Sequence, residues 1–140
     1  MTLRIPKDIL SHLEHTGEAY YPRESCGLLT GVRIDADTYS VENFHFIPNV
    51  QVDSSADYLM EPQAMHNIIM SHKPGSFREL VGLWHTHPRN KAIPSLIDLG
   101  LAQRSGRKDV PYVITSVEFK HTFAYMFTGE EFVKTELEIV

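Results

Sequence analysis

An uninterrupted apolar run over residues 80–84 (LVGLW) leads directly into His85 and His87. A strand that is apolar on both faces is typically covered on both faces, so the run predicts a buried central strand. Side chains alternate along a strand, and two histidines separated by one residue therefore point to the same side. Any fold for this chain must accommodate a buried strand that presents two imidazoles at its end.

Apolar spacing and turn residues divide the rest of the chain into helices and strands. Helices are predicted over residues 6–21, 62–72 and 95–106, and strands over residues 25–33, 39–47, 111–117, 121–127 and 131–139. The resulting order α-β-β-α-β-α-β-β-β predicts an α/β (α+β) fold with a mixed sheet flanked by helices. The length of 140 residues fits one domain, 1–140.

Composition excludes several classes of partner and location. The chain has 13 Lys+Arg against 18 Asp+Glu, a net charge of −5, which argues against nucleic acid as the main partner. The apolar run is far shorter than the ~20 residues of a membrane helix. The first twenty residues are too acidic for a signal peptide, and the single Cys26 excludes an internal disulfide. We therefore expect a cytoplasmic protein without a membrane partner.

Asp98 adds a carboxylate to the two histidines. His85, His87 and Asp98 could reach one zinc ion and leave a fourth position open, as catalytic zinc sites do. Two other interpretations stand beside this one. An isolated H-x-H can be a pair of solvated histidines at a strand end, and the segment from Ser95 to Asp98 fits a helix capping box. The capping box is compatible with a metal site, because a capped helix start is a rigid platform for a ligand.

Glu24 is the candidate proton acceptor for such a site. It lies between Pro22, where the first helix must stop, and the apolar strand that follows. The alternative is a surface glutamate paired with Arg23 or a lysine. Cys26 has no Cys-His pattern near it and is interpreted as a buried structural thiol. None of the other six histidines is assigned to metal.

The spacing H-x-H-x7-S-x2-D over His85, His87, Ser95 and Asp98 resembles the JAMM motif of the JAB/MPN metalloprotease family. The segment P-x-E-x-C-G-L-L-x-G around Glu24 is similar to bacterial and archaeal members of that family. The resemblance covers roughly residues 5–127. It implies a JAB/MPN-like, cytidine-deaminase-like architecture with a curved, mainly antiparallel sheet.

The resemblance also implies an activity. It is that of a zinc-dependent protease or isopeptidase that hydrolyses the bond after the C-terminal Gly-Gly of ubiquitin or a ubiquitin-like protein. The resemblance makes His85, His87 and Asp98 the zinc ligands, Glu24 the general base and acid, and Ser95 the oxyanion donor.

The loops over residues 51–58 and 89–93 are the candidate walls of a substrate cleft. An extended substrate tail could add to a sheet edge beside them.

Three other functions stay open at this point. The chain could release a C-terminal amino acid such as cysteine from a ubiquitin-like sulfur-carrier protein, with the same catalytic residues. It could be a non-catalytic MPN scaffold, although such relatives usually lack ligands or the glutamate. It could also be a metal-binding protein without enzymatic activity, which cleavage of a Gly-Gly-extended fusion would exclude. The oligomeric state is not predicted.

Overall fold

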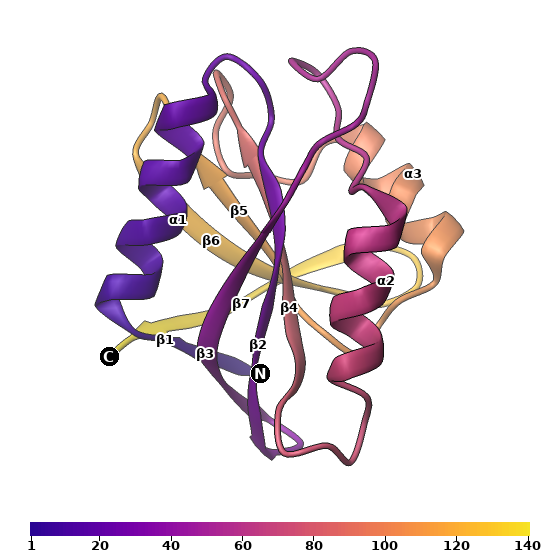
Figure 1. Cartoon of the computed structure of the whole chain (residues 1–140). Coiled ribbons are helices and arrows are strands. Elements are labelled where there is room, and N and C mark those ends of the chain that lie inside the picture. Colours follow the sequence, from indigo (N-terminus) through magenta and orange to yellow (C-terminus); the bar gives the residue numbers. More distant parts are fainter.

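A computed structural model describes all residues, 1–140, and contains seven strands and three helices (Figure 1). The strands are β1 (Thr2–Ile5), β2 (Cys26–Asp35), β3 (Thr38–Ile47), β4 (Glu79–His87), β5 (Tyr112–Ser116), β6 (His121–Phe127) and β7 (Phe132–Ile139). The helices are α1 (Lys7–Tyr20), α2 (Pro62–Ser71) and α3 (Leu96–Ser105). The predicted helices and strands are all present, with boundaries within a few residues of those expected.

The strands form one curved sheet that closes into a barrel in the order β1-β3-β2-β4-β5-β6-β7. β1 runs parallel to β3 and β7, and β4 runs parallel to β5, whereas the other neighbours are antiparallel. Helix α1 lies on one side of the sheet, and α2 and α3 lie on the other (Figure 1). The mixed sheet flanked by helices is therefore confirmed. None of the three helices combines the length and the apolar character that crossing a membrane requires.

Strand β1 is the one element that the sequence prediction lacked, so the predicted order was wrong at its start. Its Leu3 and Ile5 are fully buried in the largest apolar cluster. The strand has only four residues, and its partners lie at Thr38 and Glu136 in the chain. A segment this short gives no alternation pattern, and long-range pairing decides its structure.

Strand β4 is buried on both faces, as the apolar run predicted. Val81 and Trp84 pack with Leu13 of α1 in one cluster, whereas Leu80 belongs to a second cluster together with Leu28. The partly buried side chains of α2 cover that second cluster. Burying each large apolar side chain contributes about 1.5–3 kcal/mol relative to leaving it exposed. The packing on both sides therefore fixes the strand that carries the two histidines.

Gly17 brings α1 close to the back of this strand. A Cβ atom at this position would lie 2.9 Å from the Cγ2 atom of Thr86, the residue between the two histidines. Glycine normally weakens a helix interior by about 1 kcal/mol relative to alanine. Here its missing side chain lets the helix support the strand end directly.

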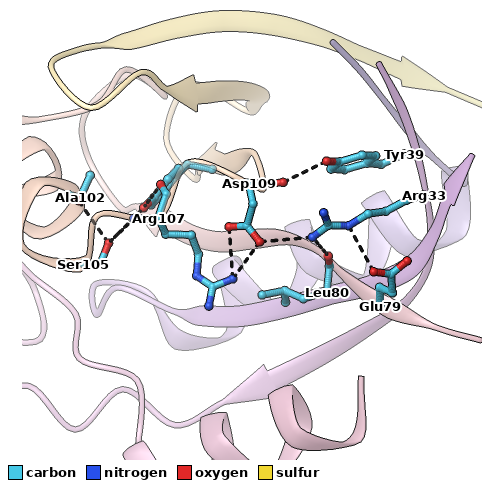
Figure 2. A network of polar contacts seen from close by, with 9 residues as sticks. Arg33, Tyr39, Glu79, Leu80, Ala102, Ser105, Arg107 and Asp109 are labelled. Carbon is cyan, nitrogen blue, oxygen red and sulfur yellow. Dashed lines mark hydrogen bonds and ion pairs between the residues drawn. The ribbon is translucent and has the colours of Figure 1, made fainter. Parts of the chain in front are cut away.

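A polar network surrounds Asp109, in the connection that leads from α3 to β5 (Figure 2). The Arg33 guanidinium donates to the Leu80 carbonyl at 3.2 Å and forms an ion pair with Asp109 at 3.3 Å. The Tyr39 hydroxyl donates to the Asp109 carbonyl at 3.0 Å. Partly exposed ion pairs contribute little to stability, so the network serves mainly to orient the connection between α3 and β5.

Candidate metal centre

Three of the predicted site residues meet in one buried cluster. His85 and His87 are the last inward-facing residues of β4, and Asp98 lies in the first turn of α3. His87 Nε2 is 2.9 Å from one carboxylate oxygen of Asp98, and His85 Nε2 is 3.2 Å from the other. The ligand atoms of all three residues lie within 4.8 Å of one another. The three residues that the sequence analysis grouped as metal ligands therefore lie together in the fold, and the group could hold a metal ion.

The donor set fits a zinc ion. The Nε2 atoms of His85 and His87 face each other at 3.3 Å, and an ionised carboxylate lies beside both. His87 Nδ1 lies 2.9 Å from the Lys91 carbonyl oxygen, which can only accept a hydrogen bond. Nδ1 therefore carries a hydrogen, which leaves Nε2, now 2.9 Å from the Asp98 carboxylate, as the nitrogen that would bind a metal ion once its own proton is displaced. Two imidazole nitrogens and a carboxylate oxygen are ligands that zinc prefers.

Tyr58 holds the ring of His85. The two rings stack with centroids 4.5 Å apart and planes inclined by 21°. Tyr58 lies just before α2, on the loop that follows β3. Neither this contact nor the Lys91 carbonyl was predicted from the sequence, because both depend on how the loops fold back over the strand end.

Ser95 and Asp98 form a complete capping box at the start of α3. Ser95 Oγ accepts a hydrogen bond from the Asp98 N–H at 3.1 Å, and the Asp98 carboxylate accepts one from the Ser95 N–H at 2.9 Å. The capping interpretation is therefore confirmed, and it is compatible with a metal ion bound at Asp98. The box uses an acceptor site of the Ser95 hydroxyl and leaves its hydrogen free to donate.

The same contacts control the charge of Asp98. Burial alone would raise the pKa of this carboxyl. The charge and hydrogen bond of His85, the hydrogen bond of His87 and the Ser95 N–H outweigh burial and hold the pKa well below its usual range. Asp98 is therefore ionised, which is the state that a metal ligand requires.

A cleft of about 430 Å³ opens beside the cluster and is lined by Glu24, His87 and Ser95. Ser55 and Ala56 from one predicted wall line it, as do Arg89, Asn90 and Ile93 from the other. The expected sheet edge is absent, because β4 pairs with β2 and with β5 at the level of His85. No free strand edge is therefore available beside His85.

Glu24 is buried at the edge of this cleft. The residue is 6% exposed, and its Oε1 atom has no hydrogen-bond partner. Burial raises the pKa of the carboxyl to about 8, with His87 lowering it and Asp98 raising it further. The alternative of a surface glutamate paired with Arg23 is wrong, since the Arg23 side chain donates to Ser54 and Asn49 instead. A buried carboxyl without a partner in a cleft is a candidate for proton transfer.

Glu24 should make the metal-free protein less stable as pH rises. The unfolded carboxyl ionises near 4.5 and the folded one near a pKa of about 8, so between these values only the folded chain keeps the proton. The free energy of unfolding then falls by about 1.4 kcal/mol per pH unit for this group. Urea unfolding at about pH 5.5 and about pH 7.5 measures the loss. This loss of unfolding free energy should be about 2–3 kcal/mol smaller in Glu24→Gln than in the wild-type protein. Equal losses in the two proteins would contradict the raised pKa of Glu24.

Cys26 is a core residue, as predicted. Its side chain is fully buried, and its thiol donates to the Ile47 carbonyl at 3.3 Å. Burial, with a contribution from Glu24, raises the pKa of the thiol to about 12. A thiol that stays protonated in the core is a poor nucleophile.

Known proteins resemble this chain along most of its length. The family described as prokaryotic homologs of the JAB domain matches residues 6–128. A desampylase of Haloferax volcanii is 30% identical over 124 residues, which cover 89% of this chain and 84% of that protein. A probable TtuB-protein conjugate cleaving protease of Thermus thermophilus is 27% identical over 123 residues, 88% of this chain and 76% of that protein. A JAB1/MPN domain protein of Archaeoglobus fulgidus has a similar fold, with a TM-score of 0.61 at 20% identity over 98% of both chains.

Proposed function

Because the chain belongs to the family of prokaryotic homologs of the JAB domain, we propose that it is a zinc metallopeptidase acting on a ubiquitin-like protein. Family membership and the JAB/MPN-like architecture confirm the resemblance of the motif. The proposed reaction is hydrolysis of the peptide or isopeptide bond after the C-terminal Gly-Gly of that protein. The Thermus thermophilus relative is named for cleaving protein conjugates, which supports this class of substrate.

The observation that carries the proposal is the convergence of three ligands beside a free carboxyl. His85, His87 and Asp98 lie within reach of one ion, and Glu24 lines the same cleft as His87. A non-catalytic scaffold would not need this full set of residues. Zinc held by the three ligands would act as a Lewis acid and lower the pKa of water from 15.7 to about 7.

Glu24 would move the proton in this reaction. Its carboxyl has an oxygen without a hydrogen bond, so it is free to accept a proton from the attacking water. It then returns the proton to the leaving nitrogen, which is either a lysine side-chain amine or a backbone amine. A proton-transfer group works best when its pKa is near the working pH. Burial raises the pKa of the Glu24 carboxyl to about 8 in the metal-free chain, and a zinc ion in the cluster would lower it, because a nearby positive charge favours the ionised form that accepts a proton.

Ser95 would stabilise the negative charge that develops on the scissile carbonyl oxygen. Its hydroxyl lines the cleft, and the capping box fixes its position while leaving the hydrogen available. Oxyanion donors of this kind accelerate a reaction because they are aimed in advance at the charge that forms.

Ser95→Ala should lower turnover by about 10²–10³-fold, because one oxyanion donor is lost. Zinc should stay bound. Loss of the cap should also reduce the free energy of unfolding by about 1 kcal/mol, whereas Ser95→Gly should cost only a few tenths. Turnover, zinc content and urea unfolding of both variants separate the two effects. Near-full turnover in both would remove Ser95 from the proposed mechanism.

The experiment that tests the function offers three substrates built on one Gly-Gly-ended ubiquitin-like protein. The first is joined to a lysine side chain, the second to a linear reporter and the third to a single C-terminal cysteine. Product masses locate the cleaved bond. We expect the zinc-loaded protein to cleave after the second glycine, and the preferred substrate separates deconjugation from trimming of a sulfur carrier. If the zinc-loaded protein cleaves none of the three substrates, the proposal is contradicted.

A further inference from the structure

We propose that Asn49 is a positioning residue that holds Glu24 and the loop over residues 50–59 as one unit. The inference rests on the proposed role of Glu24. The loop leaves β3, supplies one wall of the cleft and leads into α2 (Figure 1). Asn49 lies at its start and is buried, with 9% of its surface exposed.

The strand ladder does not hold Glu24, because β2 begins two residues later at Cys26. Its backbone is instead bonded to the loop. The Glu24 N–H donates to the Ser54 carbonyl, and the Glu24 carbonyl accepts from Asn49 Nδ2 at 2.9 Å. The next residue, Ser25, is tied to β4 through the Thr86 hydroxyl at 2.8 Å.

The Asn49 carboxamide uses both its donors and its acceptor. Besides Glu24, Nδ2 donates to the Asp57 carbonyl at 3.2 Å. Oδ1 accepts from the N–H groups of Gln51 at 3.0 Å and Leu59 at 2.9 Å. One side chain therefore joins the two ends of the loop and connects both to Glu24. Aspartate has the same shape but no donors, so it could replace only the acceptor half of these contacts.

The contacts matter because the Glu24 carboxyl has no hydrogen bond at Oε1 to fix it. Its position follows from its backbone, and the backbone follows from Asn49 and the loop. A displacement of about 1 Å at a reacting group can cost about 10²-fold in rate. Ser55 and Ala56 of the same loop line the cleft, so the loop that would meet the substrate is also hydrogen-bonded to the residue proposed as the base.

Amide hydrogen exchange tests the coupling without any substrate. In Asn49→Ala, the amides of Glu24, Gln51 and Leu59 should all exchange about tenfold faster or more, because their bonds open together. In Asn49→Asp, the Glu24 amide should exchange faster while the Gln51 and Leu59 amides stay protected. The control is Asn43→Ala, an exposed position on β3, which should change none of them. An unchanged Glu24 amide in both Asn49 variants would overturn the proposal.

A double-mutant cycle tests whether Asn49 acts through Glu24. With a Gly-Gly-ended ubiquitin-like protein fused to a reporter, each Asn49 variant should lower kcat by about 10–100-fold when every protein is assayed at saturating zinc. In the Glu24→Gln background the same change should cost less than about threefold, because the group being positioned is gone. An equal loss in both backgrounds would show that Asn49 is merely structural. If the wild-type protein cleaves nothing, the proposed function fails, and the exchange experiment still decides the coupling.

Discussion

Glu24→Gln should lower turnover by about 10²–10⁴-fold while zinc stays bound. Glutamine keeps the shape and the buried position of the side chain but cannot take up or release the proton. The measurement is steady-state cleavage of the Gly-Gly fusion alongside the zinc content of each protein. Glu14→Gln is the matched control, since burial also raises the pKa of Glu14 but this residue does not line the cleft.

Two results would contradict the role given to Glu24. Turnover near the wild-type rate in Glu24→Gln would mean that another group moves the proton. Loss of zinc from this variant would mean that Glu24 is itself a ligand. A loss of rate in the Glu14→Gln control would show that burying a neutral amide disturbs the whole protein.

Asp98→Ala should abolish both stoichiometric zinc binding and cleavage. Asp98 provides the only carboxylate in the three-ligand cluster, and its removal leaves two buried imidazoles without their shared partner. Loss of the capping box should also lower the free energy of unfolding by about 1–2 kcal/mol. Zinc content, activity and urea unfolding measure the three effects.

Glu61→Ala separates capping from metal binding. Glu61 caps α2 by accepting hydrogen bonds from the N–H groups of Gln63 and Ala64, but it is not part of the cluster. This variant should lose a similar amount of stability and keep its zinc and its activity. Zinc retained in Asp98→Ala, or lost in Glu61→Ala, would contradict the ligand assignment.

The parts of the site that follow from local sequence were predictable. The apolar run before His85 required a buried strand, and alternation placed His87 on the same side of it. Ser95 and Asp98 have the spacing of a capping box, and this spacing predicted where α3 begins. These patterns placed His85 and His87 on one side and Asp98 in the first turn of a helix, whereas the resemblance of their spacing to the JAMM motif predicted that the three meet.

The parts that depend on long-range contacts were not predictable. Strand β1 has too few residues for a pattern and gains its structure by pairing between β3 and β7. The Lys91 carbonyl behind His87 is a backbone group, and any residue type could supply it. The loop after Asn49 shows no periodicity, so its contacts with Glu24 and its delivery of Tyr58 to His85 appear only in three dimensions. An asparagine at the start of a long polar loop was the one available signal.

The central claim is that one metal ion at His85, His87 and Asp98 is required for cleavage. Titrating the metal-free protein with zinc, while following cleavage of the Gly-Gly fusion, tests this claim most directly. We predict no cleavage without zinc and a linear rise in rate that stops at about one zinc per chain, the capacity of a single three-ligand site. Cleavage by the metal-free protein would contradict the claim, and so would a protein that binds one zinc per chain and still does not cleave the fusion.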